Sequence, residues 1–203
     1  MENYWGLTFR NFMDFYHGTT IGGLKELKPF AFPNNNLKEP VVYLTINKQL
    51  ALHYIKDRNE SPMLNINNNG KLIFEEMFSE ALEILFKGKS GYIYHCVGDY
   101  EINKNTGVLT TATSDKPVPV KDCEFIEDVY EKILEYGKYG MFYREKYEEL
   151  PEWRHYIIRG WVMKWIKEGN WLNNPESNDF KKFNERWPRY LEEALILSKY
   201  DLL

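Results

Sequence analysis

Apolar and polar residues alternate in short runs through the first two thirds of the chain, which is the pattern of half-buried β-strands. The strongest run extends from Tyr92 to Val97 and is rich in aromatic and β-branched residues. Similar but shorter runs lie at residues 12–17, 41–44 and 123–126, and shorter strands still are expected near residues 108–111 and 118–120. We therefore expect a sheet-containing front part.

Helical spacing interrupts these strands. Apolar residues from 74 to 86 and from 129 to 137 recur every three to four positions, so we predict packing helices there. Residues 21–27 could form one or two helical turns, and residues 57–70 are expected to be a surface excursion because they are polar and broken by proline and an Asn-Asn-Asn-Gly turn.

A short helix is also expected after the strand at 41–44. Thr45 is a plausible N-cap and Asn47 is the alternative, since either side chain can accept from backbone N–H groups that the first turn leaves unpaired. Leu50, Ala51 and Tyr54 would share one face of this helix.

Beyond Gly140 the pattern becomes wholly helical and aromatic. A helix opening at Pro151 has tryptophan or isoleucine at every fourth position to residue 165, and further helices are predicted at 179–187 and 188–197. Such aromatic stripes are usually buried core. We divide the chain into a core at 1–140 and a C-terminal helical extension at 141–203 packed on that core.

Composition narrows the classes of function. The 203 residues carry a formal net charge of -4, with a pI near 5.7, and their acidic and basic residues are interspersed, so a nucleic-acid backbone is not the expected partner. No long apolar run or secretory leader is evident, which predicts a soluble cytoplasmic protein without a membrane partner. Cys96 and Cys123 are expected to be reduced thiols.

Several kinds of chemistry lack support. The four histidines form no helical ligand pair, and His95 and Cys96 are adjacent on a strand and so face opposite ways, which argues against a metal site. No glycine-rich phosphate loop is present, and nothing local supports a nucleophile built from Cys123 and His17.

One set of short motifs does favour a function. The segment Tyr16-His17-Gly18-Thr19 ends an apolar run, Val42-Tyr43-Leu44-Thr45 ends the next, and Ala51-Leu52-His53-Tyr54 follows it. In this order and spacing they resemble the His-Gly-Ser/Thr, first-tyrosine and second-tyrosine pattern of the diphtheria-toxin and poly(ADP-ribose)-polymerase clade of ADP-ribosyltransferases. The resemblance covers about the first third of the chain.

The resemblance implies an α+β fold, with split antiparallel sheets and flanking helices, that binds NAD as co-substrate. His17 would bond a ribose hydroxyl, the Gly18 backbone would hold the carboxamide, and Tyr43 and Tyr54 would flank the nicotinamide ring. Thr19 completes the expected NAD-binding set. Stacking and cation–π attraction suit a flat cationic ring between aromatic faces.

The resemblance also implies a catalytic glutamate on a later strand, acting with His17 and Tyr43. We choose Glu124, with Glu127 and Asp122 as rivals. A carboxylate there would stabilise the oxocarbenium-like transition state of nicotinamide loss. The family often has a serine where this chain has Ala51, so one nicotinamide contact would be missing.

The sequence therefore predicts a mono-ADP-ribosyltransferase with an unknown acceptor, which could be a protein, a nucleic acid or a small molecule. Two alternatives stay open. One is an inactive or weak NAD-binding module, and the other is an interaction protein acting through its C-terminal helices. An RNA 2′-phosphotransferase is less favoured because the expected arginines are not evident.

Overall fold

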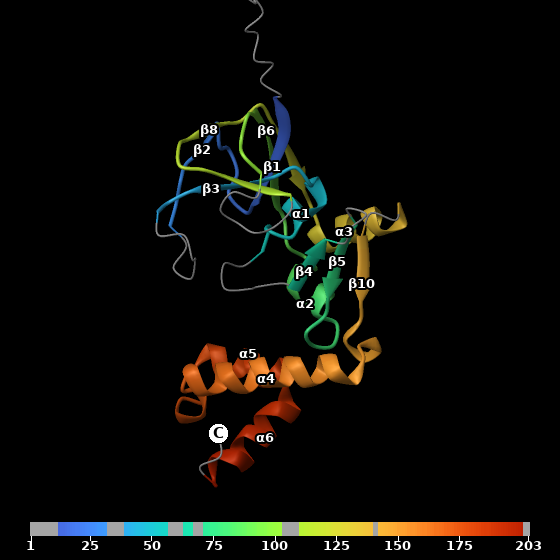
Figure 1. Ribbon diagram of the computed structural model, residues 1–203, viewed down its shortest axis with the longest axis vertical. Coiled ribbons are helices and arrows are strands. Elements are labelled where there is room, and N and C mark those ends of the chain that lie inside the picture. The colour runs from blue at the N-terminus through green and yellow to red at the C-terminus, as the bar shows by residue number, and fades with distance from the viewer. Residues whose placement is uncertain are drawn as a thin grey trace, which may run out of the picture. The chain divides into compact units, whose positions relative to one another are not determined.

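The structure is a computed structural model that describes residues 12–31, 39–56, 63–66, 71–102, 110–139 and 142–200. The chain forms two compact units (Figure 1). Unit 1 contains residues 1–73 and 82–143, and unit 2 contains residues 74–81 and 144–203. The short segment 74–81 thus belongs with the C-terminal helices, although it lies in the middle of the sequence. Most of the expected excursion at 57–70 and the first part of the strand expected near 108–111 lie outside the described residues.

Unit 1 is built around a five-stranded sheet in which every neighbouring pair is antiparallel. The strand order is β7-β3-β1-β6-β9, with bounds β1 Met13–Thr19, β3 Val42–Thr45, β6 Gly91–Gly98, β7 Thr111–Ser114 and β9 Asp122–Ile126. The predicted mixture of helices and antiparallel strands is confirmed, and the strands at 12–17, 41–44, 92–97 and 123–126 are found close to their expected bounds.

One face of this sheet carries an apolar core cluster of unit 1. Apolar side chains from β1, β3, β6 and β7 gather there and are almost fully buried, namely Phe15, Val42, Leu44, Tyr94, Cys96 and Ala112. A two-stranded sheet of β2 (Glu26–Leu27) and β8 (Val118–Pro119) contributes Leu27 and Val118 to the same cluster. We call this side of the sheet the core face.

The helical turns predicted for residues 21–27 are wrong. The buried Tyr94 hydroxyl donates to the Ile21 carbonyl at 2.9 Å and accepts from the Leu24 N–H at 3.1 Å, and Glu26–Leu27 pairs with β8. These long-range partners satisfy backbone groups that a helix would have paired locally. The segment therefore forms no helical turn and is tied instead to Tyr94 and β8.

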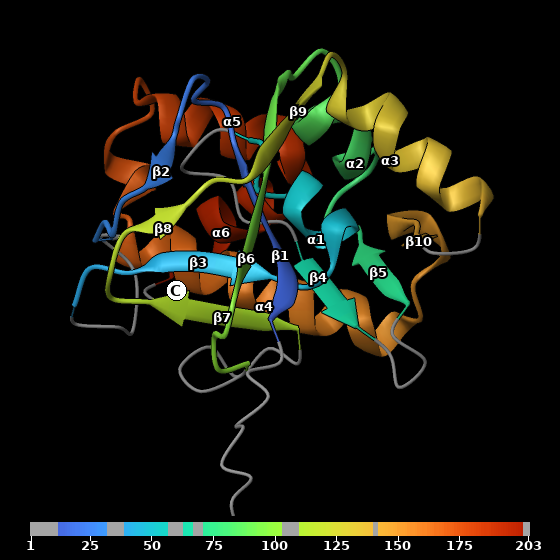
Figure 2. The ribbon, with the colours of Figure 1, turned by 90° about the horizontal axis from the view of Figure 1, so that it is seen from above.

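Helix α1 (Lys48–Leu52) packs on the other side of the sheet, where it contacts β1, β3 and β6 (Figure 2). Asn47 is its N-cap, because its side chain accepts from the N–H groups of Gln49 and Leu50. Of the two predicted N-cap residues, Asn47 is therefore confirmed and Thr45 is not. Thr45 instead accepts from the Asn47 N–H at 3.0 Å. We call the side of the sheet on which α1 packs the α1 face. Helix α3 (Val129–Lys138) forms close to its predicted bounds and contacts α1.

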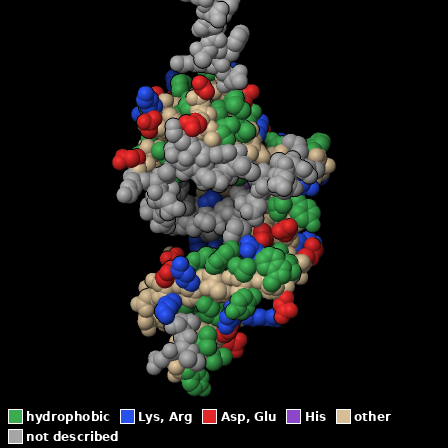
Figure 3. Space-filling model, in the orientation of Figure 1, with side chains coloured by type: hydrophobic (Ala, Val, Ile, Leu, Met, Phe, Trp, Pro, Cys, Tyr) green, Lys and Arg blue, Asp and Glu red, His purple; other side chains and the backbone are tan. Residues whose placement is uncertain are grey.

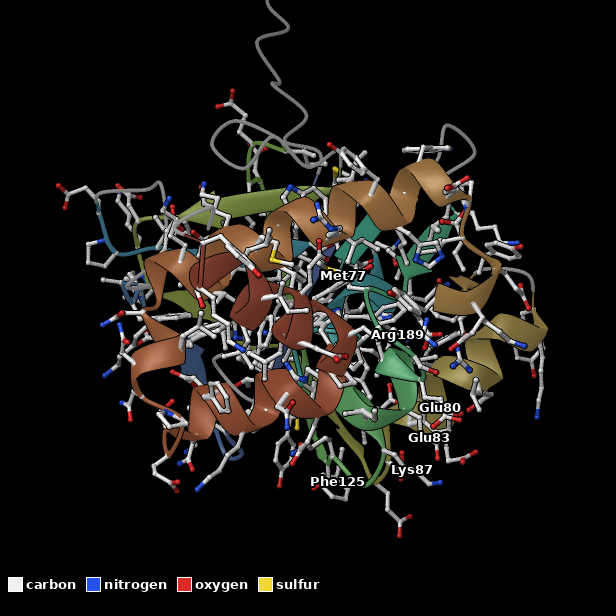
Figure 4. All side chains as sticks on the ribbon, turned by 90° about the horizontal axis from the view of Figure 1, so that it is seen from below. Met77, Glu80, Glu83, Lys87, Phe125 and Arg189 are labelled. Atoms are coloured by element: carbon white, nitrogen blue, oxygen red, sulfur yellow. The ribbon has the colours of Figure 1, made fainter. Side chains whose placement is uncertain are left out.

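The single helix predicted over residues 74–86 is wrong in its first half. The segment begins as β5 (Leu72–Glu75), passes Glu80 in a left-handed conformation at φ 56°, and becomes helical only in α2 (Ala81–Phe86). Within α2 and just after it, Glu83 and Lys87 form an ion pair at 2.5 Å (Figure 4). Strand β5 pairs with β4 (Met63–Ile66) and β10 (Phe142–Glu145), two strands that sequence patterning missed.

Unit 2 contains the three helices α4 (Glu152–Glu168), α5 (Asn178–Arg186) and α6 (Pro188–Ser198), with 3₁₀ turns η1 (Tyr147–Glu149) and η2 (Trp171–Asn173). The helices expected after Pro151, at 179–187 and at 188–197 are confirmed to within about a residue. On the face visible in Figure 3, acidic and basic side chains lie beside one another on these helices. The interspersed charges of the sequence therefore persist on this surface.

Trp187 explains why residues 74–81 belong to unit 2. Its indole N–H donates to the Met77 carbonyl at 2.8 Å, and its ring meets Phe78 edge-on (Figure 4 labels Met77). Two ion pairs also connect this part of the chain to the C-terminal part. The buried Glu75 carboxylate accepts from Arg154 at 2.7 Å, and the fully buried Glu76 carboxylate accepts from Arg144 at 2.8 Å. Leaving either carboxylate without its partner would be costly, so these pairs fix the segment.

Among the described residues, no helix is long and apolar enough to cross a membrane.

Candidate functional site

His17 lies where strands β1 and β3 separate. β1 pairs with β6 along all seven of its residues, but its register with β3 contains only Tyr16 opposite Thr45. One residue further on, His17 Nδ1 lies 2.8 Å from the Tyr43 carbonyl oxygen. The imidazole N–H thus donates to a strand carbonyl and holds the separating strands together through a side chain.

The same hydrogen bond defines the chemistry of His17. Because Nδ1 carries the donated proton, Nε2 of the neutral ring is left as an acceptor. Burial lowers the pKa of His17, and the bond to the Tyr43 carbonyl offsets part of that lowering. The ring is therefore neutral near pH 7 and can accept from a hydroxyl group.

Gly18 is required by a close approach to α1. A Cβ atom at this position would lie 1.8 Å from the Ala51 carbonyl oxygen and 2.8 Å from its carbonyl carbon. Backbone atoms cannot yield as a flexible side chain can, so only glycine fits. Ala51 is itself fully buried. The glycine of the His-Gly-Thr motif consequently has a packing role, whatever else it does.

The two tyrosines of the motif lie near each other. Tyr43 alternates along β3 with the core residues Val42 and Leu44 and so projects toward the α1 face. Tyr54 follows the end of α1 rather than lying within it, and 47% of its surface is exposed. Burial of the phenol raises the pKa of Tyr54, and the neighbouring Tyr43 raises it further. Thr19 ends β1 and accepts from the Ile21 N–H at 3.3 Å.

Cross-strand register places Glu124 relative to these residues. Gly18 lies opposite Ile93, which in turn lies opposite Glu124, whereas His17 lies opposite Tyr94. Directly opposed residues project to the same face of a sheet, and neighbours along a strand project to opposite faces. Glu124 therefore shares the α1 face with Gly18 and Tyr43, and the His17 side chain belongs to the core face.

Glu124 is held by an ion pair. Its Oε2 lies 2.5 Å from the ammonium nitrogen of Lys48, the first residue of α1, and each side chain is a little over one third exposed. Burial alone would lower the pKa of Lys48, but the hydrogen bond and charge of Glu124, together with Tyr136 and Tyr16, raise it overall. Lys48 thus stays cationic beside the carboxylate. Nothing in the sequence pattern alone signals this pair.

The rival acids are placed differently. Asp122 is two residues from Glu124 on β9, so it faces the same way, but its Oδ1 accepts from the Cys123 N–H at 2.8 Å. Glu127 follows the end of β9 and is exposed. Of the three, Glu124 is the one in contact with α1.

The remaining histidine of the motif is structural. His53 is 1% exposed, its Nδ1 lies 2.8 Å from the Gln49 carbonyl, and its ring packs against Phe86 and Phe142. Burial lowers the pKa of His53 to about 4. It is therefore a neutral core residue. In the part of the chain that is described, no group of three or more His, Cys, Asp or Glu side chains is placed to hold a metal ion.

The structure also brings together polar residues that sequence reasoning missed. Asp14 and Tyr16 on β1 lie on the α1 face, and so does His95 on β6, because Tyr16 is directly opposite His95. The Asp14 carboxylate lies 2.6 Å from His95 Nε2, and the Tyr16 and His95 rings stack at 5.4 Å. Alternation along each strand indicates which residues share a face, but only the register shows that they meet.

Comparisons of the chain with family models, with curated proteins and with solved structures gave no match.

Proposed function

We propose that the chain is a mono-ADP-ribosyltransferase, which takes ADP-ribose from NAD, releases nicotinamide and modifies an acceptor. The observation that carries the proposal is the hydrogen bond from His17 Nδ1 to the Tyr43 carbonyl at the point where β1 and β3 separate. It leaves a neutral imidazole nitrogen to accept from a ribose hydroxyl, at the point where the β1–β3 register ends.

The two faces of the sheet would then serve the two ends of the dinucleotide. His17 would meet the adenosine ribose from the core-face side, while Tyr43 and Tyr54 would flank the nicotinamide ring from the α1 face. Aromatic faces attract a cationic ring, and the attraction weakens once the bond to ribose breaks and the ring becomes neutral. This difference favours release of nicotinamide.

Glu124 is the proposed catalytic carboxylate. Loss of nicotinamide places positive charge on the ribose C1′ and ring oxygen, and a nearby anion stabilises that charge. Lys48 pairs with the Glu124 carboxylate and orients it from α1. The pair is partly exposed, so Lys48 can move aside or turn to the NAD phosphates without the cost of leaving a fully buried charge.

A direct test is nicotinamide release from NAD by the wild type, by Glu124→Gln and by Glu127→Gln. We expect Glu124→Gln to lose about 100-fold or more, the usual scale for removing a transition-state electrostatic contact, and Glu127→Gln to keep wild-type activity as the matched control. Equal rates for the wild type and Glu124→Gln would remove the role assigned to Glu124.

A second candidate is an NAD-binding module without transfer activity. Two observations favour it: the Ala51 carbonyl already occupies the side of Gly18, and Lys48 neutralises Glu124. Calorimetry that finds NAD binding, together with no nicotinamide release under any condition, would select this candidate over the transferase.

A further inference from the structure

Five side chains form a continuous polar array across the α1 face of unit 1: Asp14, His95, Tyr16, Lys48 and Glu124. Asp14 contacts His95 at 2.6 Å, His95 stacks on Tyr16 with ring centroids 5.4 Å apart, the Lys48 ammonium lies 5.9 Å from the Tyr16 ring centre, and Lys48 pairs with Glu124 at 2.5 Å. The array joins β1, β6, β9 and α1. At one end of the array lies Glu124, the proposed catalytic carboxylate. The Asp14–His95 pair at the other end has no role in the function proposed above.

Asp14 determines which nitrogen of His95 is available. A carboxylate accepts hydrogen bonds, so Nε2 carries the proton in the contact with Asp14, and Nδ1 of the neutral ring has a free lone pair. Among the described residues, the one side-chain hydrogen bond of His95 is at Nε2, and about a quarter of the His95 side chain (23%) is exposed. In enzymes that use an imidazole as general base, a carboxylate commonly fixes the tautomer of the ring and stabilises its positive charge once it is protonated.

His95 also lies within reach of the proposed reaction centre. It is directly opposite Asp122, and Glu124 is the next residue of β9 on the same face. Diagonal neighbours of this kind are separated by about 7–8 Å. That distance accommodates a small acceptor group between the imidazole and a sugar carbon held at Glu124.

We propose that His95 is the general base of the transfer step, with Asp14 as its positioning residue, and that the acceptor group is a neutral hydroxyl. This inference rests on the proposed function. The acceptor oxygen forms a bond to ribose C1′ as the C1′–N bond breaks. The electron pair of that bond leaves with neutral nicotinamide, and the hydroxyl proton moves to His95 Nδ1.

Charge on the α1 face favours a hydroxyl over a carboxylate acceptor. Asp14, Asp122 and Glu124 all project to this face around His95, and Lys48 is already paired. An anionic acceptor would meet repulsion from these carboxylates, and it would need no base because it arrives without a proton. A neutral hydroxyl avoids the repulsion and uses the base.

The test compares two small nucleophiles, methanol and azide, as acceptors of ADP-ribose from NAD. Methanol must lose a proton when it attacks, whereas azide has none to lose. In His95→Asn we expect transfer to methanol to fall about 100-fold, the lower end of a general-base contribution. Transfer to azide, which the carboxylates repel equally in both proteins, should stay within a few-fold of the wild-type rate with azide. His155→Asn in unit 2 is the matched control and should leave both reactions unchanged.

Asp14→Asn gives an independent readout. ¹⁵N NMR of the wild type should find His95 protonated at Nε2, and the substitution should shift the tautomer and lower methanol transfer without lowering azide transfer. The base role is overturned if His95→Asn transfers to methanol as well as the wild type does, or if it loses methanol and azide transfer alike. If the wild type releases no nicotinamide with either nucleophile, the transferase proposal itself fails, and the base role of His95 fails with it.

Discussion

The two faces of the sheet in unit 1 are built from the same strands but differ in character: an apolar cluster lines the core face, whereas the α1 face places polar side chains beside the buried Ile93 and Ile126. On the core face, Phe15 and Tyr94 are fully buried among aliphatic side chains. On the α1 face, the neighbours Tyr16 and His95 stack on one another, and His95 also contacts a partly exposed carboxylate. A shift of one residue, from Phe15 to Tyr16 or from Tyr94 to His95, separates the apolar cluster from the polar array.

This difference teaches that the stability and the chemistry of unit 1 can be altered separately. Substitutions in the apolar cluster of the core face should change the free energy of unfolding, and substitutions in the polar array should change reactions with NAD while leaving the fold intact. The predictions below are ordered by the size of the expected effect.

Phe15→Ala should have the largest effect. Removal of a fully buried phenyl ring, which also meets Tyr100 edge-on, leaves a cavity and should lower the free energy of unfolding by about 3–5 kcal/mol. Tyr16→Ala, one residue away on the α1 face, should cost about 1 kcal/mol. Denaturant titration of both variants checks the contrast, and equal losses would break the distinction between the faces.

Acid should destabilise the protein through His53. Its pKa is about 4 in the folded state against 6.5 for the free side chain, so the unfolded chain binds the proton more readily. Above pH 6.5 His53 is neutral in both states and has no effect on the free energy of unfolding. As the pH falls from 6.5 toward 4, the unfolded chain takes up the proton first, and the free energy of unfolding decreases by up to about 3 kcal/mol. The lowered pKa of His17 acts with the same sign.

The variant His53→Gln isolates this effect from the titration of carboxylates. We expect the difference in unfolding free energy between wild type and variant to shrink as the pH is lowered from 7 to 4, because glutamine does not titrate. A difference that stays constant over this range would show that His53 takes up a proton as readily in the folded protein as in the unfolded chain.

Gly18→Ala should destabilise by about 1–3 kcal/mol, because the new methyl group would overlap the Ala51 carbonyl and push α1 from the sheet. Gly137→Ala is the control: in helix α3 its Cβ would meet only Phe142, at 3.7 Å, and the change should stabilise the helix slightly. Thermal unfolding of the pair measures the difference. If Gly18→Ala melts at the wild-type temperature, the close approach of α1 does not hold in solution.

Much of the fold could be predicted from local pattern. Strands such as Tyr92–Val97 and the helices after Pro151 follow their own periodicity, and they were found where expected. Residues 21–27 and 74–80 were not, because their conformation is set by distant groups: the Tyr94 hydroxyl in one case, and Trp187 with two arginines in the other. No local signal encodes such partners.

The candidate site divides in the same way. His17, Gly18 and Tyr43 belong to short contiguous motifs, and the structure does bring His17 to the Tyr43 backbone. The contacts of Lys48 with Glu124 and of Asp14 with His95 depend on how β1, β6 and β9 are aligned. A single-residue slip would abolish both, so they were beyond what sequence patterning can predict.

The most direct test of the transferase proposal is an NMR titration of the labelled protein with NAD. The account predicts that the largest shifts fall on the amides of Gly18, Tyr43 and Tyr54, where β1 and β3 separate and α1 ends, with smaller shifts around Glu124. Signals at these positions that stay unchanged at millimolar NAD would contradict it.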